Sequence, residues 1–173
     1  MTPPAQKQPA LRPYLPDDAA TVVEIFRASV EELTGDDYSA DQQAAWISVA
    51  DDVDAFNARL AGQLTLIATL DHEPVGFASL KGTDHLDMLY VHPHAVGQGV
   101  GSALCDALEK LAALRGATRL TVDASDTAQP FFADRGYSAE RRNTVSRNGE
   151  WLSNTLMQKR LQPAGQDKQG SVQ

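Results

Sequence analysis

Hydrophobic positions change their spacing several times along the chain, and each change marks a predicted element. Between residues 22 and 33, apolar side chains recur every three or four positions, which predicts an amphipathic helix. A second helix is expected to start near Ser39 and a third to cover residues 53–60. The N-terminal third is therefore predicted to be mainly helical, after one short strand over residues 10–15.

Beyond residue 63, short apolar runs between turn residues predict strands. Residues 64–70 (LTLIATL) and 75–80 (VGFASL) flank a tight DHEP turn and form a hairpin. Residues 86–91 (LDMLYV) form a third strand, which ends at Pro93 because proline has no N–H for the ladder. The remaining elements are a leucine-rich helix ending at Gly116, a strand (119–124), a short helix (127–135) and two strands (137–146 and 151–161) around Asn148-Gly149, a strong hairpin signal.

This order of elements predicts an α+β domain in which helices pack on a mixed sheet. A chain of 173 residues favours a single domain. We expect that domain to span residues 10–161. Residues 1–9 and 162–173 are polar and cannot bury enough surface to order themselves, so both segments are predicted to be disordered.

The charge balance narrows the possible partners. A formal net charge of -8 disfavours nucleic acid and anionic membrane surfaces, since binding to either depends on basic side chains. The apolar runs are too short to cross a bilayer, and no secretory signal is recognisable. Cys105 is the single cysteine and cannot form an internal disulfide, so we expect a cytoplasmic protein, either a monomer or a homodimer.

The most informative stretch is residues 88–104, MLYVHPHAVGQGVGSAL, which predicts a strand, a glycine-rich loop and a helix in direct succession. Glycine lets the backbone approach a ligand closely and adopt positive φ angles. The first turn of a helix leaves N–H groups unpaired and carries a positive dipole end. Together these features predict a pyrophosphate site, to which Ser102 can add a hydroxyl.

Three alternatives compete for this loop. A dinucleotide fingerprint fails because Ser102 stands where a third glycine is required, although Asp123 lies roughly where a ribose-binding acid would fall. A phosphate-binding P-loop fails because no Gly-Lys-Ser/Thr follows. A purely structural turn into a helix remains possible, but three alternating glycines favour a ligand site.

At these residues the sequence resembles the GNAT superfamily of N-acetyltransferases. The family signature is Gln/Arg-x-x-Gly-x-Gly/Ala, and its two glycines correspond to Gly99 and Gly101. The chain departs at the first position, where Val96 replaces a side chain that often assists the pyrophosphate. The resemblance implies acetyl-CoA as co-substrate, held by a loop of seven residues: Val96, Gly97, Gln98, Gly99, Val100, Gly101 and Ser102.

The resemblance extends over nearly the whole predicted domain, and the C-terminal hairpin looks like a bacterial subgroup of mostly unassigned substrate. It implies a mostly antiparallel mixed sheet with a splayed central strand pair. The backbone of Leu89, Tyr90 and Val91 would pair with the pantetheine arm. A second CoA-contacting region would include Ser125, Phe131 and Phe132. For the two phenylalanines a role in the core is the more frequent alternative.

Two residues are candidates for catalysis. Asp87 lies within the strand that should hold the thioester, on the face predicted to carry Leu89 and Val91, and could accept the amine proton through a water. In many family members a Tyr four residues before a Gly-Tyr pair protonates the thiolate, but Phe132 stands there. Water or the Ser125 hydroxyl could substitute, and Ser125 could equally cap the next helix.

Tyr38 and Trp46 are candidates for binding the acceptor, because the family places this helical region over the acceptor side; a core role is equally open. Several carboxylates lie close to them in the sequence and could attract an ammonium group. No metal site is expected, since the histidines lack ligand spacing and His92 and His94 are expected to point apart around Pro93. Cys105 is read as a small buried apolar group. The nearby carboxylates are Glu31, Glu32, Asp36 and Asp37.

These observations predict an N-acetyltransferase that moves the acetyl group of acetyl-CoA onto a primary amine, expected to belong to a small molecule. Attack would be direct, within a ternary complex. The alternative is a non-catalytic acyl-CoA-binding module, which Val96 and the missing tyrosine at position 132 both motivate.

Overall fold

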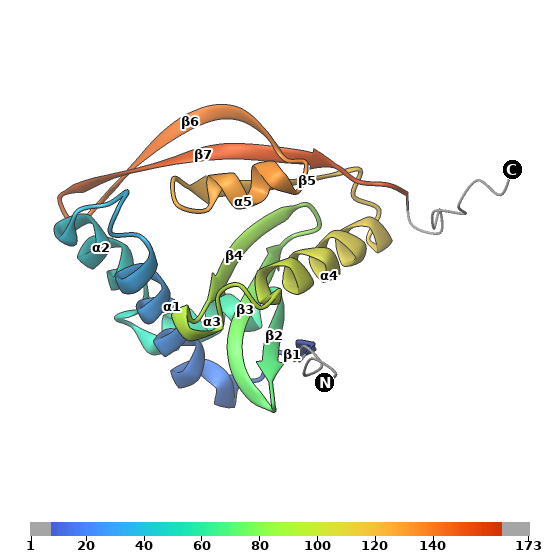
Figure 1. Cartoon of the computed structure of the whole chain (residues 1–173), viewed down its shortest axis with the longest axis horizontal. Helices are drawn as coiled ribbons and strands as arrows, with labels where there is room; N and C mark the ends of the chain where they lie inside the picture. The colour runs from blue at the N-terminus through green and yellow to red at the C-terminus, as the bar shows by residue number, and fades with distance from the viewer. Residues whose placement is uncertain (1–7, 164–173) are drawn as a thin grey trace, which may run out of the picture.

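The computed structural model describes residues 8–163, in which helices flank one seven-stranded sheet (Figure 1). The predicted disorder therefore falls mostly outside the described residues. The strands, in chain order, are β1 Ala10–Pro13, β2 Leu64–Leu70, β3 Glu73–Lys81, β4 His85–Val91, β5 Arg119–Ser125, β6 Ser138–Arg147 and β7 Glu150–Arg160. The α-helices are α1 Ala19–Leu33, α2 Ala40–Ile47, α3 Val53–Ala61, α4 Val100–Leu114 and α5 Gln129–Asp134.

The strand order is β1-β2-β3-β4-β5-β7-β6, and only the pairing of β4 with β5 is parallel. That pairing covers two residue pairs, His85 with Thr121 and Leu86 with Val122. Beyond them β4 runs on to Val91 and β5 to Ser125 without pairing, so the two central strands separate toward their C-terminal ends. The predicted α+β class, the mostly antiparallel sheet and the splayed central pair are all confirmed.

A β-bulge lies in β4 at Asp87. Ser79 of β3 is paired with Met88 and Leu80 with Leu86, so Asp87 is an extra residue without a partner on β3. The extra residue shifts the alternation of side chains. Asp87 reaches the α3 side of the sheet, where it meets Arg59. The prediction that Asp87 shares a face with Leu89 and Val91, which pack on the α4 side, is therefore wrong.

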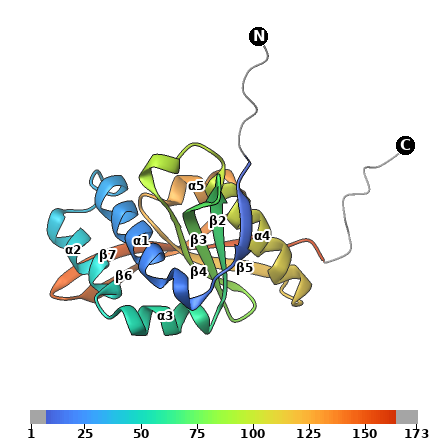
Figure 2. The same ribbon diagram turned by 90° about the horizontal axis from the view of Figure 1, so that it is seen from below.

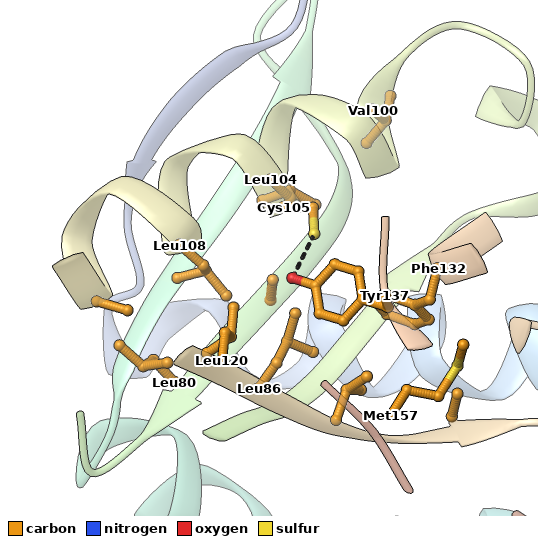
Figure 3. Packing of buried hydrophobic residues seen from close by; sticks show 14 of the residues in the cluster. Leu80, Leu86, Val100, Leu104, Cys105, Leu108, Leu120, Phe132, Tyr137 and Met157 are labelled. Carbon is orange, nitrogen blue, oxygen red and sulfur yellow. Dashed lines mark hydrogen bonds between the residues drawn. The ribbon is translucent and has the colours of Figure 1, made fainter. Parts of the chain in front are cut away.

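Each face of the sheet carries its own hydrophobic core. On one face α4 and α5 pack over β3, β4 and β5, with Leu104, Leu108 and Leu120 fully buried (Figure 3). The helices α1 and α3 lie on the other face (Figure 2). There they bury Phe26 and Phe56 against Phe77 of β3. Helices therefore pack on both faces of the central strands, and the gap between β4 and β5 lies within the sheet, between these two helical layers.

The first turn of α4 sits unusually close to the sheet because Gly76 has no side chain. A Cβ at Gly76 would lie 2.8 Å from Val100 Cγ1 and 3.1 Å from the Tyr90 carbonyl oxygen. This contact sets the position of the helix start relative to β4. Among the described residues, no helix is long and apolar enough to cross a membrane.

We predict that Gly76→Ala lowers the free energy of unfolding by about 1–3 kcal/mol, because the added methyl overpacks this contact. The measurement is urea unfolding followed by circular dichroism. Val100→Ala removes the methyl that clashes, so the double variant should recover part of the loss. An unchanged unfolding midpoint in Gly76→Ala would show that α4 is free to shift.

Candidate functional site

The loop before α4 presents an open backbone surface. Gly97 and Gly99 have φ angles of +83° and +79°, and nothing lies within 4 Å of a Cβ built on either residue. Gly101 follows in the first turn of α4, where the Phe131 ring would lie 3.5 Å from its Cβ. The first N–H groups of α4 have no acceptor within the helix. The loop can therefore cradle a pyrophosphate with its backbone, and the residues fit CoA at this position.

Side chains of the loop do not fill the cradle. Val96 is 53% exposed. Because its side chain is apolar, it offers no hydrogen bond to a bound anion. The Gln98 amide donates to the His94 carbonyl oxygen at 3.2 Å, inside the loop itself. His92 and His94 do not point apart, because the 3-10 turn Pro93–Ala95 folds the chain back and leaves their ring centroids 4.0 Å apart.

Backbone N–H groups of β4 point into the gap beside β5. The His92 N–H donates to the Val75 carbonyl oxygen on the β3 side at 2.7 Å. Successive N–H groups on a strand point to opposite edges, so those of Val91 and Leu89 point away from β3. β5 does not pair with this part of β4, so both groups can donate to a ligand that enters the gap.

A pocket of about 320 Å³ opens where β4 and β5 separate. Its walls come from α2, α3 and the β6–β7 hairpin, and its floor from the two separating strands. Predicted acceptor residues Tyr38 and Trp46 both line it, as do Asp87, Ser125 and Phe132. The structure thus brings the catalytic and acceptor candidates into one cavity, whose lining does not include residues 96–102 of the glycine loop.

Asp87 is held by two neighbours on the α3 side. The Arg59 guanidinium donates to both of its carboxylate oxygens at 2.9 Å, and the Gln63 amide donates a further bond at 2.9 Å. Burial raises the pKa of Asp87, but the hydrogen bonds from Arg59 and Gln63 outweigh it and leave the pKa below its usual value. Arg59 and Gln63 therefore hold the Asp87 carboxylate in place and favour its charged form.

Asp123 faces the same pocket from β5 and is held less tightly. Its side chain is 45% exposed, and the nearest cationic candidate is His85, whose Nε2 lies 3.6 Å away. The Asn143 amide donates to it at 3.4 Å. Asp123 and Asp87 therefore flank the base of the gap from opposite strands, and only Asp123 keeps a carboxylate open to water.

Ser125 and Phe132, both predicted CoA contacts, line the pocket. Ser125 Oγ accepts from the Ala128 N–H at 3.1 Å, so the expected capping role is present. The hydroxyl still has its own O–H to donate. Phe132 is 2% exposed and packs on Tyr137, whereas Phe131 lies against Gly101. Phe132 belongs to the core and also forms part of the pocket wall.

Tyr38 ties three segments together. Its hydroxyl donates to the Ser153 carbonyl oxygen at 2.7 Å and accepts from the Asp126 N–H at 2.9 Å. The Trp46 indole packs on Tyr38 and donates to the Tyr90 hydroxyl at 3.2 Å. Burial raises the pKa of Tyr90 to about 12. The two aromatic candidates thus have both roles, since they belong to the packed interior and face the pocket.

Some sequence-based expectations do not match the lining of this pocket. None of the four N-terminal carboxylates lines it, and Asp37 instead accepts a bond from Thr127 at 2.7 Å. Cys105 is buried as expected, and burial raises the pKa of its thiol to about 11. The thiol nevertheless has polar neighbours, donating to Glu109 at 3.3 Å and lying 3.7 Å from the Tyr137 hydroxyl (Figure 3).

Sequence reasoning missed several polar residues of the pocket, namely Arg59, Asp123 as an acceptor-side group, Arg147 and Asn154. Asp123 and Asn154 carry a detectable signal. Asp123 is a polar residue between Val122 and Ala124 on a predicted strand, and Asn154 shares a strand face with Leu152 and Leu156. Arg59 and Arg147 carry none, because a basic residue on a helix or beside a turn is usually solvated.

Comparison with known proteins places these features in a family context. A family profile described as "Acetyltransferase (GNAT) domain" matches residues 34–161. Uncharacterized N-acetyltransferase YafP of Escherichia coli is 33% identical over 85% of this chain and 93% of its own length. Peptidyl-lysine N-acetyltransferase YjaB of Salmonella typhimurium is 28% identical over 72% of this chain and 70% of its own length.

A solved structure described as a GCN5-related N-acetyltransferase, "Aminotransferase, Class-II", from Rhodopseudomonas palustris is 68% identical. It superimposes with a TM-score of 0.89 over 91% of this chain and 98% of that chain. The fold of this chain is therefore shared with a solved structure of high sequence identity.

We predict that Gly99→Leu weakens CoA binding at least tenfold, because a side chain at this open position fills the surface that a pyrophosphate needs. Isothermal titration calorimetry measures the affinity. Gly116→Leu is the matched control, since Gly116 also has a positive φ of +89° and open space around it but lies at the far end of α4. Equal CoA affinity in the two variants would contradict the assigned cradle.

Proposed function

Because the chain belongs to the GNAT family of acetyltransferases and is an acetyl-CoA-dependent N-acetyltransferase, we propose that its acceptor is the primary amine of a small molecule. Acetyl transfer would proceed by direct attack in a ternary complex. One observation carries the proposal: the pocket opens at the separation of β4 and β5, and its lining includes Leu89 and Tyr90 of the strand that leads into the glycine loop. A donor held by the loop and an acceptor held in the pocket would meet in that gap.

Binding of acetyl-CoA would rest on the backbone of this chain. The N–H groups of residues 97–102 would hold the pyrophosphate, and the edge of β4 at Leu89 and Val91 would hold the pantetheine arm. When bound, acetyl-CoA supplies an activated thioester. Since Val96 offers no donor, the affinity rests more heavily on backbone N–H groups here than in members with Gln or Arg.

The N–H groups of Leu89 and Val91 also have a role in catalysis. They point into the gap and are fixed by the ladder between β4 and β3. Donors that are already oriented stabilise negative charge as it develops on a carbonyl oxygen. One of these two N–H groups would donate a hydrogen bond to that oxygen, and no side chain would need to rearrange.

Asp123 is our choice for the proton acceptor. Sequence reasoning favoured Asp87, and that prediction has yet to be tested. Arg59 and Gln63 occupy the Asp87 carboxylate, whereas the Asp123 carboxylate remains half-exposed within the same pocket. The ammonium would lose its proton through a water to Asp123, while Asp87 keeps Arg59 in place.

Ser125 would serve the leaving thiolate. Its Oγ is fixed by the Ala128 N–H and its own O–H is free to point into the pocket. Phe132 cannot supply a proton. A thiol with a reference pKa of about 8.5 leaves readily near neutral pH, so a hydroxyl or a water is sufficient.

The pocket geometry supports a small acceptor. Its walls come from separate parts of the chain, so a ligand of small-molecule size is surrounded on several sides. The relative YjaB is named as a peptidyl-lysine acetyltransferase, which makes a lysine side chain the competing acceptor. We keep the cytoplasm as the expected location, since acetyl-CoA and a free buried thiol at Cys105 both suit it.

We predict turnover of small primary amines when thiol release from acetyl-CoA is assayed against a panel. The panel contains alkylamines, amino acids, polyamines and a lysine-containing peptide. Small amines should give the higher kcat/KM. A clear preference for the peptide would contradict the proposed acceptor class, and CoA binding without turnover of any amine would favour a non-catalytic role.

We further predict that Asp123→Asn lowers kcat/KM at least tenfold at neutral pH and less at high pH, where free amine is abundant without a base. Asp87→Asn is the matched comparison. It should lower kcat/KM less than Asp123→Asn does, but lower the free energy of unfolding more, because Arg59 loses its charged partner. Profiles of kcat/KM against pH for both variants decide between the two carboxylates. The opposite ranking would identify Asp87 as the proton acceptor.

A further inference from the structure

Two opposite charges at different ends of the pocket have no firm partner. Four charged side chains line it: Arg59, Asp87, Asp123 and Arg147. Arg59 and Asp87 neutralise each other through two hydrogen bonds at 2.9 Å. Asp123 remains at the base of the gap and Arg147 at the other end, so the cavity has an anionic and a cationic end.

Arg147 is fixed within the pocket without a carboxylate of its own. Its Nε donates to Ser48 Oγ at 3.2 Å, and its side chain is partly buried among the pocket walls. Within residues 8–163, no ion pair is formed by Arg147, whereas Arg59, the other arginine that lines the pocket, is paired with Asp87. The bond to Ser48 leaves the terminal nitrogens of the guanidinium free to donate.

The position of Arg147 along β6 sets its distance from the reacting centre. Ser125 of β5, Asn154 of β7 and Asn143 of β6 lie in one row across the sheet. Arg147 lies four residues beyond Asn143 on the same face, which is about 13 Å along the strand. An acceptor that reaches from the gap to Arg147 must therefore be elongated.

We propose that Arg147 binds an anionic group on the acceptor, so that the substrate is an amine carrying a carboxylate or a phosphate at its opposite end. This inference rests on the proposed function and narrows its substrate class. A planar guanidinium matches both anions with two parallel hydrogen bonds. The anion would orient the substrate so that its amine lies beside Asp123 at the gap.

The test compares matched amines that differ only in the distal group. Suitable pairs are ε-aminocaproate with hexylamine and γ-aminobutyrate with butylamine, and aminobutylphosphonate separates a phosphate-type anion from a carboxylate. Wild-type enzyme should show a kcat/KM about tenfold to a hundredfold higher for the anionic member of at least one pair, the range expected for charge-assisted hydrogen bonds. Within the anionic set, the better substrate identifies the source of the charge.

Arg147→Gln should abolish that preference while leaving kcat/KM for the neutral amine within about threefold of wild type, since no reacting group has been changed. Arg147→Lys should retain part of the preference, because the charge remains and the fork is lost. Arg141→Gln is the matched control, since Arg141 lies exposed on the same strand and outside the pocket lining. Equal discrimination in wild type and Arg147→Gln would overturn the inference and leave the proposed function intact.

A binding measurement separates this inference from failure of the proposed function. The acetylated products, N-acetyl-ε-aminocaproate and N-acetylhexylamine, can be titrated into wild type and Arg147→Gln by calorimetry without any turnover. Tighter binding of the anionic product, lost in Arg147→Gln, would support the anion subsite even if no amine were acetylated. Equal binding of both products to wild type would count against it.

Discussion

The site depends on one constraint: β4 and β5 are parallel neighbours that stay paired over only two residues. On their other sides, β3 pairs along β4 with the bulge at Asp87, and β7 pairs along β5 without a register shift. Helices on both faces hold the two strands in place while they separate. The gap is therefore a fixed feature of the sheet, and its exposed backbone N–H groups are available to a ligand at no further cost in reorganisation.

Polar contacts close the region around the gap and join parts of the chain that are distant in sequence. Tyr38 links the segment between α1 and α2 to both β7 and the turn after β5. Arg59 joins α3 to the bulge of β4 through Asp87. These contacts place helices that cover the acceptor side at a defined height above the separated strands. The same bulge that turns Asp87 toward α3 leaves Asp123 as the carboxylate open to the pocket.

Most of the fold could be predicted from the sequence, because apolar spacing and turn residues act locally. Ser39 starts α2 with a capping bond to Gln42, and Asn148-Gly149 forms the turn of the last hairpin. The glycine loop was also predictable, since its chemistry lies in consecutive residues. The bulge at Asp87 was not predictable, because a bulge is defined by how two strands pair and the sequence of one strand does not show that pairing. Arg147 and Arg59 were missed for a related reason: their roles depend on contacts with Ser48 and Asp87, which lie far away in sequence.

The central claim is that donor and acceptor meet between β4 and β5, with the donor held by the unpaired edge of β4. Amide hydrogen exchange with and without CoA, resolved by NMR, tests it most directly. CoA should slow exchange at Leu89 and Val91 and in residues 97–102, while the already paired amides of β4 that face β3 change little. Protection of the glycine loop without any change at Leu89 and Val91 would contradict the claim, because the pantetheine arm would then follow another path.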